Sequence, residues 1–315
     1  MSIKKVLGLI TILFFGCQSS NQTKIIKYSV KDFFNNISIY GGYFSSSEKN
    51  LIYSSNESGI FNIYEVEISS GSVQKLTSSD KESLFVRSYV PESNDYIYSA
   101  DQGGNEINHL YLQNREGETV DLTPGKNEKS IFYKWSADNR FLYYLSNKRD
   151  SRYFDLYKMK VDEWEPKIVY ENKDNFSLTD ISNNENYLLL SKSVTTSENK
   201  FYLYDINKGQ SKEISIESGS YSSAGFSNDN KSFYYLTNAD NEFTYLKKHN
   251  IETGESSVVF EAKWDVMYSY MSKNEKFRVI GINEDGKNII KVIDIKTNKY
   301  LDFPSFEGTD VTGIV

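Results

Sequence analysis

Ser47-Glu48-Lys49-Asn50 is the first of six short polar turns that recur at an almost constant spacing. The steps from Glu48 through Ser93, Asp138, Asn184, Asp229 and Asn274 are 45, 45, 46, 45 and 45 residues. A repeat of about 40 to 50 residues built from short strands is typical of the blades of a β-propeller. The other five turns are Glu92-Ser93-Asn94-Asp95, Ala137-Asp138-Asn139-Arg140, Asn183-Asn184-Glu185-Asn186, Asn228-Asp229-Asn230-Lys231 and Lys273-Asn274-Glu275-Lys276.

The residues between the turns predict four strands in each repeat. An apolar, aromatic-rich run of strand length follows every turn, as in Leu51-Ile52-Tyr53. A second run comes about ten residues later, and turn residues such as Gly103-Gly104-Asn105 between the two runs predict a hairpin. A third run such as Val73-Gln74-Lys75-Leu76-Thr77, and a strand ahead of the turn such as Leu84-Phe85-Val86, complete the unit. We therefore expect an all-β propeller with six four-stranded blades over residues 37–308.

Composition and charge agree with one β-rich domain and disfavour a nucleic-acid partner. The 315 residues include 25 Tyr and 19 Phe but only 4 Pro, which fits many half-buried strands. The net charge is -7, and no cluster of Lys and Arg forms the basic stripe that binding to a phosphate backbone requires. One cysteine excludes internal disulfides as a source of stability.

The N-terminal residues predict export. Lys4 and Lys5 precede a short apolar run, Val6 to Phe15, which is too short to span a bilayer and is typical of a signal peptide over residues 1–16. Gly16 before Cys17 resembles the lipobox of bacterial lipoproteins, although Phe14 and Phe15 are larger than usual there. We expect a lipidated Cys17 with a tether over 17–24, a lead-in segment over 25–36, and a membrane-anchored periplasmic lipoprotein of a Gram-negative-type bacterium. The alternative is an ordinary secretory signal with a chance cysteine.

The C-terminal residues predict an unfinished repeat. The next polar turn is due near position 319, and Thr309 to Val315 has the character of the first strand of a seventh blade. An open ring would leave two apolar blade faces in water, which is unfavourable. We therefore expect that the sequence is a fragment of a longer product with 309–315 as the start of the next blade. Six blades that close on themselves are the alternative.

One stretch narrows the propeller to a family. Residues 99–112, Ser-Ala-Asp-Gln-Gly-Gly-Asn-Glu followed by Ile-Asn-His-Leu-Tyr-Leu, together with Asp121-Leu122-Thr123-Pro124-Gly125, resemble the N-terminal propeller of bacterial prolyl oligopeptidase family serine peptidases. These include dipeptidyl-peptidase and acylaminoacyl-peptidase relatives, and residues 28–34 are similar to the lead-in of the exported members. The resemblance implies that the propeller admits peptides to a following α/β-hydrolase domain, a covalently linked partner that holds the Ser-His-Asp triad. No catalytic residue is carried over to this chain.

Other candidate sites have simpler structural interpretations. Gly219-Ser220-Tyr221-Ser222-Ser223-Ala224-Gly225 lacks the Gly-x-Ser-x-Gly spacing of a nucleophile elbow and falls where an inner strand is due. The two histidines, His109 and His249, are 140 residues apart, and we expect each to be a strand or turn residue. Acidic pairs lie at expected hairpin turns, and no metal or cofactor is predicted. These pairs are Asp101 with Glu106 and Glu284 with Asp285, the latter within Asn283-Glu284-Asp285-Gly286.

Tryptophans could line a peptide channel. Of Trp135, Trp164 and Trp264, Trp135 is the best placed because it lies on an expected inner strand. Packing between blades is the simpler role for it.

Two functions remain from the sequence. The first is the substrate-gating, non-catalytic propeller of an exported serine peptidase. The second is a complete propeller lipoprotein that resembles the TolB-like periplasmic scaffolds. A Gly-x-Ser-x-Gly segment downstream of Val315 in the gene would favour the first, and an immediate stop codon the second.

Overall fold

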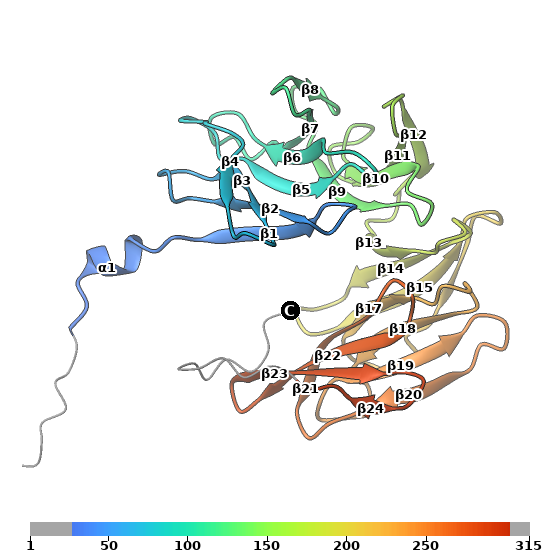
Figure 1. The fold of residues 1–315 in the computed structure, drawn as a ribbon. Coiled ribbons are helices and arrows are strands. Elements are labelled where there is room, and N and C mark those ends of the chain that lie inside the picture. The colour runs from blue at the N-terminus through green and yellow to red at the C-terminus, as the bar shows by residue number, and fades with distance from the viewer. Residues whose placement is uncertain (1–26, 303–315) are drawn as a thin grey trace, which may run out of the picture. The chain divides into compact units, whose positions relative to one another are not determined.

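The computed structural model of the chain describes residues 27–302. The predictions for residues 1–16, Cys17, the tether at 17–24 and the strand at 309–315 lie outside these residues. The chain divides into two units, residues 1–38 and residues 39–315. In the first unit, the short helix α1 (Val30–Phe34) begins with a capping box, in which Ser29 and Asp32 each bind the backbone N–H of the other (Figure 1).

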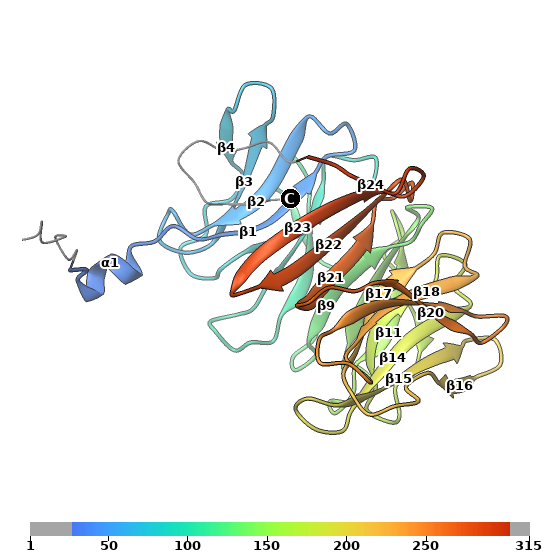
Figure 2. The ribbon, with the colours of Figure 1, turned by 90° about the horizontal axis from the view of Figure 1, so that it is seen from below.

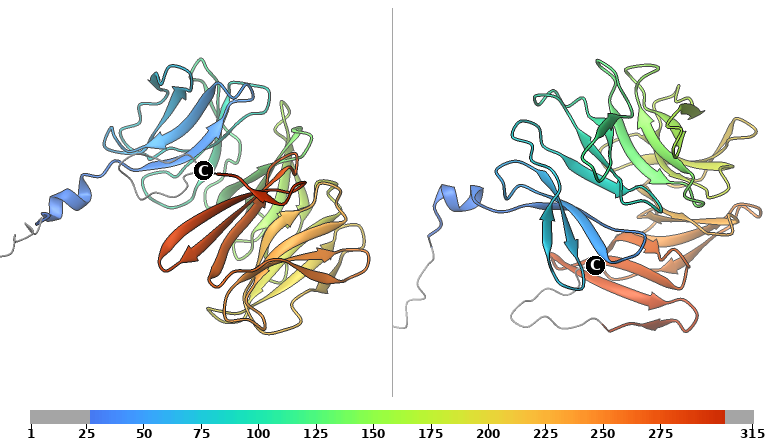
Figure 3. Two further views of the ribbon diagram at one scale, coloured as in Figure 1. Left: turned by 60° about the horizontal axis from the view of Figure 1, so that its bottom comes forward. Right: turned by 45° about the horizontal axis from the view of Figure 1, so that its top comes forward.

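The second unit contains six antiparallel sheets of four strands each, which we call blades 1 to 6 in chain order. In every blade the four strands pair in the order in which they occur in the chain, as an up-and-down meander. The blades follow one another around a ring, which the blue-to-red progression of colour makes visible (Figure 3). The all-β, six-bladed prediction is confirmed.

The strands have these bounds. Blades 1 and 2 contain β1 (Ile39–Phe44), β2 (Asn50–Ser55), β3 (Asn62–Glu67), β4 (Val73–Lys75), β5 (Phe85–Tyr89), β6 (Tyr96–Ala100), β7 (His109–Gln113) and β8 (Thr119–Asp121). Blades 3 and 4 contain β9 (Ser130–Trp135), β10 (Phe141–Ser146), β11 (Asp155–Lys160), β12 (Pro166–Tyr170), β13 (Ser177–Ile181), β14 (Tyr187–Ser193), β15 (Asn199–Asp205) and β16 (Gln210–Glu213). Blades 5 and 6 contain β17 (Tyr221–Phe226), β18 (Ser232–Thr237), β19 (Tyr245–Asn250), β20 (Ser256–Phe260), β21 (Asp265–Met271), β22 (Phe277–Glu284), β23 (Lys287–Asp294) and β24 (Lys299–Tyr300).

The polar turn joins the first and second strands of each blade. In five blades a serine opens it, and the serine Oγ accepts a hydrogen bond from the backbone N–H five residues later, as in Phe141 to Ser136 at 2.9 Å. The equivalent serines are Ser45, Ser182, Ser227 and Ser272. Each of the six turns also has one residue with positive φ, between 52° and 60°: Glu48, Glu92, Asn139, Glu185, Asn230 and Glu275. The sequence repeat is therefore a repeated turn geometry.

Neighbouring polar turns also bind one another at several seams. The Glu92 N–H donates to Ser46 Oγ at 3.0 Å between blades 1 and 2. The Asn184 N–H donates to Asn230 Oδ1 at 3.1 Å between blades 4 and 5. Between blades 5 and 6 the Asn228 N–H donates to the carboxylate of Glu275 at 2.6 Å. These bonds form a polar collar on the turn side of the blades.

Apolar clusters fill the seams between consecutive blades. Five clusters of buried side chains join blade 1 to 2, 2 to 3, 3 to 4, 4 to 5 and 5 to 6. The cluster of blades 2 and 3 contains Leu110 and Leu142, both with no exposed surface. Among the described residues no such cluster joins blade 6 to blade 1. Figure 2 shows blade 6 with β22 and β23 inside its sheet and β24 at its edge.

Candidate functional site: the axial cavity

The first strands of the blades surround a central space. One cavity of about 570 Å³ is lined from β9, β13, β17 and β21, and a second of about 450 Å³ is lined from β1, β5 and β9. Lys273, which follows β21, lines both cavities, so we call them together the axial cavity. Each first strand is thus the inner strand of its blade.

Every inner strand carries a β-bulge. The register of each inner strand against its neighbour slips once, and the inserted residues are Gly41 with Gly42, Arg87, Tyr133, Thr179, Ala224 with Gly225, and Met267. Bulges bend a strand and redirect its side chains, and they are common beside functional sites. Gly225 has a φ of 95°, which strongly favours glycine at this bulge. The bulges therefore shape the wall of the axial cavity.

A charged pair crosses the wall between blades 3 and 4. Lys134 Nζ lies 2.7 Å from Asp180 Oδ1 and donates a further hydrogen bond to the Ile181 carbonyl at 2.7 Å. The other carboxylate oxygen of Asp180 accepts the Phe226 N–H of blade 5 at 3.1 Å. One carboxylate thus ties together the inner strands of three blades. The Asp180 side chain is only 13% exposed, so this pair is better shielded from solvent than a surface pair.

Trp135 and Ser88 form the matching contact between blades 2 and 3. The indole Nε1 donates to Ser88 Oγ at 2.9 Å, and both residues line the axial cavity. The ring also packs edge-on against Phe132 and contacts the apolar cluster of this seam. Trp135 therefore packs between blades and faces the cavity as well. Its expected place on an inner strand is confirmed.

A half-buried arginine lies on the inner strand of blade 2. Arg87, the bulge residue of β5, donates from Nε to Ser99 Oγ at 2.9 Å. Burial lowers the pKa of this guanidinium below its usual value, yet it stays charged at neutral pH because that usual value is so high.

Most of the propeller sequence matches one known protein family. Residues 75–314 match the model of the prolyl oligopeptidase N-terminal β-propeller domain. The chain belongs to this family. The predicted resemblance to prolyl oligopeptidases is thereby confirmed, and the match begins at the end of blade 1. It gives no support to the scaffold alternative. No curated protein matches the chain.

Solved structures agree on the fold. A structure from a study of two prolyl endopeptidases, which concerns the role of inter-domain dynamics in their catalysis and specificity, is similar to this chain with a TM-score of 0.63 and 13% identity. The similarity covers 86% of this chain and 44% of the other. The prolyl oligopeptidase propeller described here therefore spans less than half of that chain.

The two histidines of this prolyl oligopeptidase propeller lie in strands, as expected. His109 in β7 has its Nδ1 2.7 Å from the carboxylate of Asp121. His249 in β19 has its Nδ1 2.9 Å from Ser256 Oγ. Burial lowers the pKa of His249 to about 4, and the positive charge of Lys212 adds to this effect. The histidines belong to separate blades and do not meet.

The other candidate sites are hairpin turns and an inner strand. Asp101 and Glu106 belong to the β6–β7 loop, where Asp101 Oδ2 accepts the Glu106 N–H at 2.8 Å. Asp285 and Gly286 form the two-residue turn between β22 and β23, both with positive φ. The Gly219 to Gly225 segment leads into and forms most of β17. Within residues 27–302, no three His, Cys, Asp or Glu side chains are grouped to hold a metal ion.

Trp164 and Trp264 lie away from the axial cavity's lining. Trp264 contacts Phe243 and is 38% exposed, whereas Trp164 lies between β11 and β12 beside the cluster of blades 2 and 3. Among residues 27–302, no helix has both the length and the apolar character needed to cross a membrane.

Sequence reasoning missed Lys134 and Asp180. Both belong to inner strands that the repeat predicts, but a bulge separates each from the regular alternation that would indicate its direction. A comparison of the six inner strands at the same distance before the polar turn offers a signal, because Lys134 and Asp180 are the two charged residues at this position and the other four copies have Tyr43, Ser88, Gly225 and Tyr270.

Proposed function

We propose that this chain is the non-catalytic, substrate-gating propeller of an exported serine peptidase of the prolyl oligopeptidase family. The observation that carries the proposal is the axial cavity, which is lined by inner strands and not filled by their side chains. An extended peptide is narrow enough to enter such a space, whereas a folded domain is not. Gating by the propeller would restrict the enzyme to peptides.

The chemistry would reside in a partner domain of the same polypeptide. An α/β-hydrolase domain would supply serine, histidine and an acid for acyl transfer to water. The partial coverage of the solved relative's chain supports this arrangement. We further propose that residues 309–315 begin a seventh blade. The absence of an apolar cluster between blades 6 and 1 among the described residues supports it.

The N-terminal residues support export and a lipid anchor at Cys17. Metabolic labelling with palmitate should mark the wild-type protein and not Cys17→Ser. Equal labelling of both proteins would contradict the anchor, and loss of export in both would contradict the signal peptide.

Narrowing the axial cavity tests the gating role. Lys273 is exposed and lines both parts of the cavity, so Lys273→Trp should obstruct it without disturbing a core. In the complete peptidase we expect kcat/KM to fall about tenfold for a labelled decapeptide and to stay within about twofold for a dipeptide substrate. Lys248→Trp, on blade 5 outside the axial cavity's lining, is the matched control. Equal activity of Lys273→Trp and wild type on the decapeptide would mean that peptides enter by another route.

A further inference from the structure

A further cavity lies at the seam of blades 2 and 3, and none of its lining residues lines the axial cavity. Its volume is about 430 Å³, within the range of sites for small ligands. Its apolar wall combines Leu122 and Pro124 of blade 2 with Tyr144, Trp164 and Pro166 of blade 3. We call it the seam pocket.

Trp164 occupies a position where other blades have glycine or asparagine. It closes the turn between the third and fourth strands, with its N–H bound to the Lys160 carbonyl at 2.9 Å and a φ of 52°. The same turn has the same backbone bond and a positive φ at Gly71, Gly209, Gly254 and Asn298. A bulky residue at positive φ is a rare and strained choice. The strained turn at Trp164 positions the indole at the wall of the seam pocket.

Ser130 gives an independent sign of a ligand. This serine, the first residue of β9, lines the seam pocket and is 2% exposed. Its Oγ is buried and has no hydrogen-bond partner in the protein. A buried hydroxyl without a hydrogen-bond partner costs free energy because its contacts with water are not replaced, and such groups are rare in native structures. A ligand hydrogen bond, reached by a change of serine rotamer, supplies one.

The charged side chains at the rim of the seam pocket determine which sign of charge a ligand can carry there. Four carboxylates and one lysine line the seam pocket: Asp121, Glu128, Glu163, Glu165 and Lys148. Within residues 27–302, Glu165 has neither an ion-pair nor a hydrogen-bond partner, whereas Glu163 pairs with Lys160. The rim therefore favours a cation.

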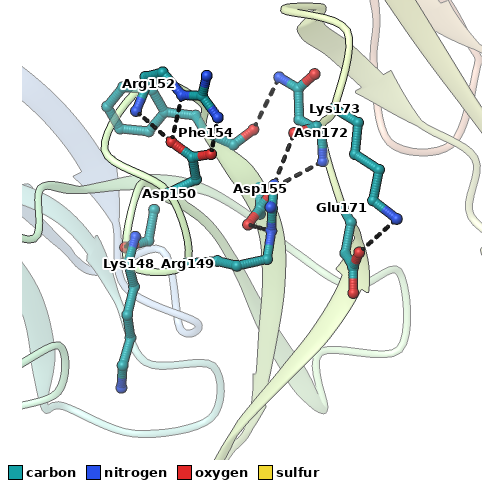
Figure 4. Close-up of polar contacts among 10 residues, drawn as sticks. Lys148, Arg149, Asp150, Arg152, Phe154, Asp155, Glu171, Asn172 and Lys173 are labelled. Carbon is teal, nitrogen blue, oxygen red and sulfur yellow. Dashed lines mark hydrogen bonds and ion pairs between the residues drawn. The ribbon is translucent and has the colours of Figure 1, made fainter.

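The loop that carries Lys148 is firmly held. The adjacent Arg149 binds the fully buried Asp155 through two nitrogens, at 2.7 and 2.8 Å, and also donates to the Asn172 carbonyl. Figure 4 shows the Lys148 side chain pointing away from this pair. The rim is thus fixed on the side of blade 3.

We propose that the seam pocket binds a basic peptide segment, with an arginine side chain stacked on Trp164 and facing Glu165. The planar guanidinium both stacks on aromatic rings and pairs with carboxylates. The proline-lined wall accommodates the neighbouring peptide residues, and the hydroxyl of Ser130 binds the peptide backbone. This exosite does not rest on the proposed gating function, because none of its residues lines the axial cavity.

Calorimetric titration of the protein with Ac-Ala-Arg-Pro-Ala-amide tests the proposal. We expect saturable binding, and binding at least about tenfold weaker to the same peptide with Glu in place of Arg. Trp135→Phe with Trp264→Phe leaves Trp164 as the only tryptophan, and its emission should change along the same binding curve. Absence of saturable binding, or equal binding of both peptides, would overturn the proposal.

Two variants separate binding from folding. Ser130→Ala removes a hydroxyl with no partner, so its melting temperature should equal or exceed that of wild type while its affinity for the arginine peptide falls several-fold. Trp164→Asn keeps a residue that its turn accepts, as at Asn298, and should lose the binding. Trp264→Phe is the matched control and should bind as wild type does. Unchanged affinity in folded Trp164→Asn would show that the indole serves packing alone.

Discussion

His249 ties the stability of blade 5 to pH. Its ring is buried against Phe233, its Nε2 has no hydrogen-bond partner, and its pKa is lowered to about 4. Between pH 6.5 and about 4, His249 is therefore protonated in the unfolded chain but stays neutral in the folded chain. The contribution of His249 to the free energy of unfolding should be fully present above pH 6.5. It should be lost as the pH drops to about 4, which lowers the free energy of unfolding by up to about 3 kcal/mol.

Urea unfolding at several pH values checks this expectation. His249→Gln should flatten the loss between pH 6.5 and 4, while His109→Gln should keep the contribution of His249. The same slope in His249→Gln as in wild type would contradict the assignment.

The carboxylate of Glu65 in blade 1 links this blade to blade 2 through a hydrogen bond and an ion pair. It is 8% exposed, accepts the Tyr89 hydroxyl, and pairs with Arg115, whose Nη1 lies 3.2 Å from Oε2. Glu65→Ala would leave the guanidinium and the phenol without their acceptor, so we expect a loss of about 3 kcal/mol in the free energy of unfolding. Lys160→Ala, which breaks the exposed pair with Glu163, should cost under about 0.5 kcal/mol. Similar costs in denaturant titrations would contradict this difference.

At the scale of the element, the polar turn is the feature to test. Ser227 is 6% exposed, accepts the Ser232 N–H at 3.0 Å and donates to Asp229 at 2.6 Å. Ser227→Ala should lower the free energy of unfolding by about 1 to 2 kcal/mol, because the Ser232 N–H loses its side-chain acceptor in a buried place. Ser93→Ala, in the blade where valine replaces the opening serine, should cost less. Thermal melts of both variants compare them.

The same turns explain how far the sequence could predict the fold. They fix the repeat length, and the runs between them have the length and the apolar, aromatic-rich composition of strands, so strands such as β2 and β6 fall where expected. The bulges could not be predicted in this way. An inserted residue such as Tyr133 or Thr179 leaves the composition of the run typical of a strand and only changes which face each side chain occupies. The Lys134–Asp180 pair and Trp164 depend on such local geometry, so they emerge only from the structure.

At the scale of the whole propeller, the faces of blades 1 and 6 that point away from blades 2 and 5 carry apolar side chains. In blade 6 these include Val292 opposite Val279, because the alternate residues Ile280 and Ile293 pack toward blade 5. If a seventh blade covers this face in the complete protein, Val292→Asp should destabilise it by about 2 to 4 kcal/mol. Val258→Asp, on an exposed outer strand, should change stability by less than about 0.5 kcal/mol. Equal, small effects would contradict a seventh blade.

The polar collar also bears on how the propeller can move. Its bonds tie neighbouring blades at the turn rim, and backbone bonds tie them at the opposite rim as well: the Ser130 N–H donates to the Asn108 carbonyl at 2.8 Å and the Val266 N–H donates to the Thr244 carbonyl at 2.9 Å. Between the two rims the seam contacts are mainly non-directional apolar packing. Hydrogen bonds at both rims resist separation of two blades, so neither rim acts as a free edge about which a seam could swing open. Thermal motion should therefore open a whole seam cooperatively, with both rows of bonds lost together, and should not swing two blades apart about one rim.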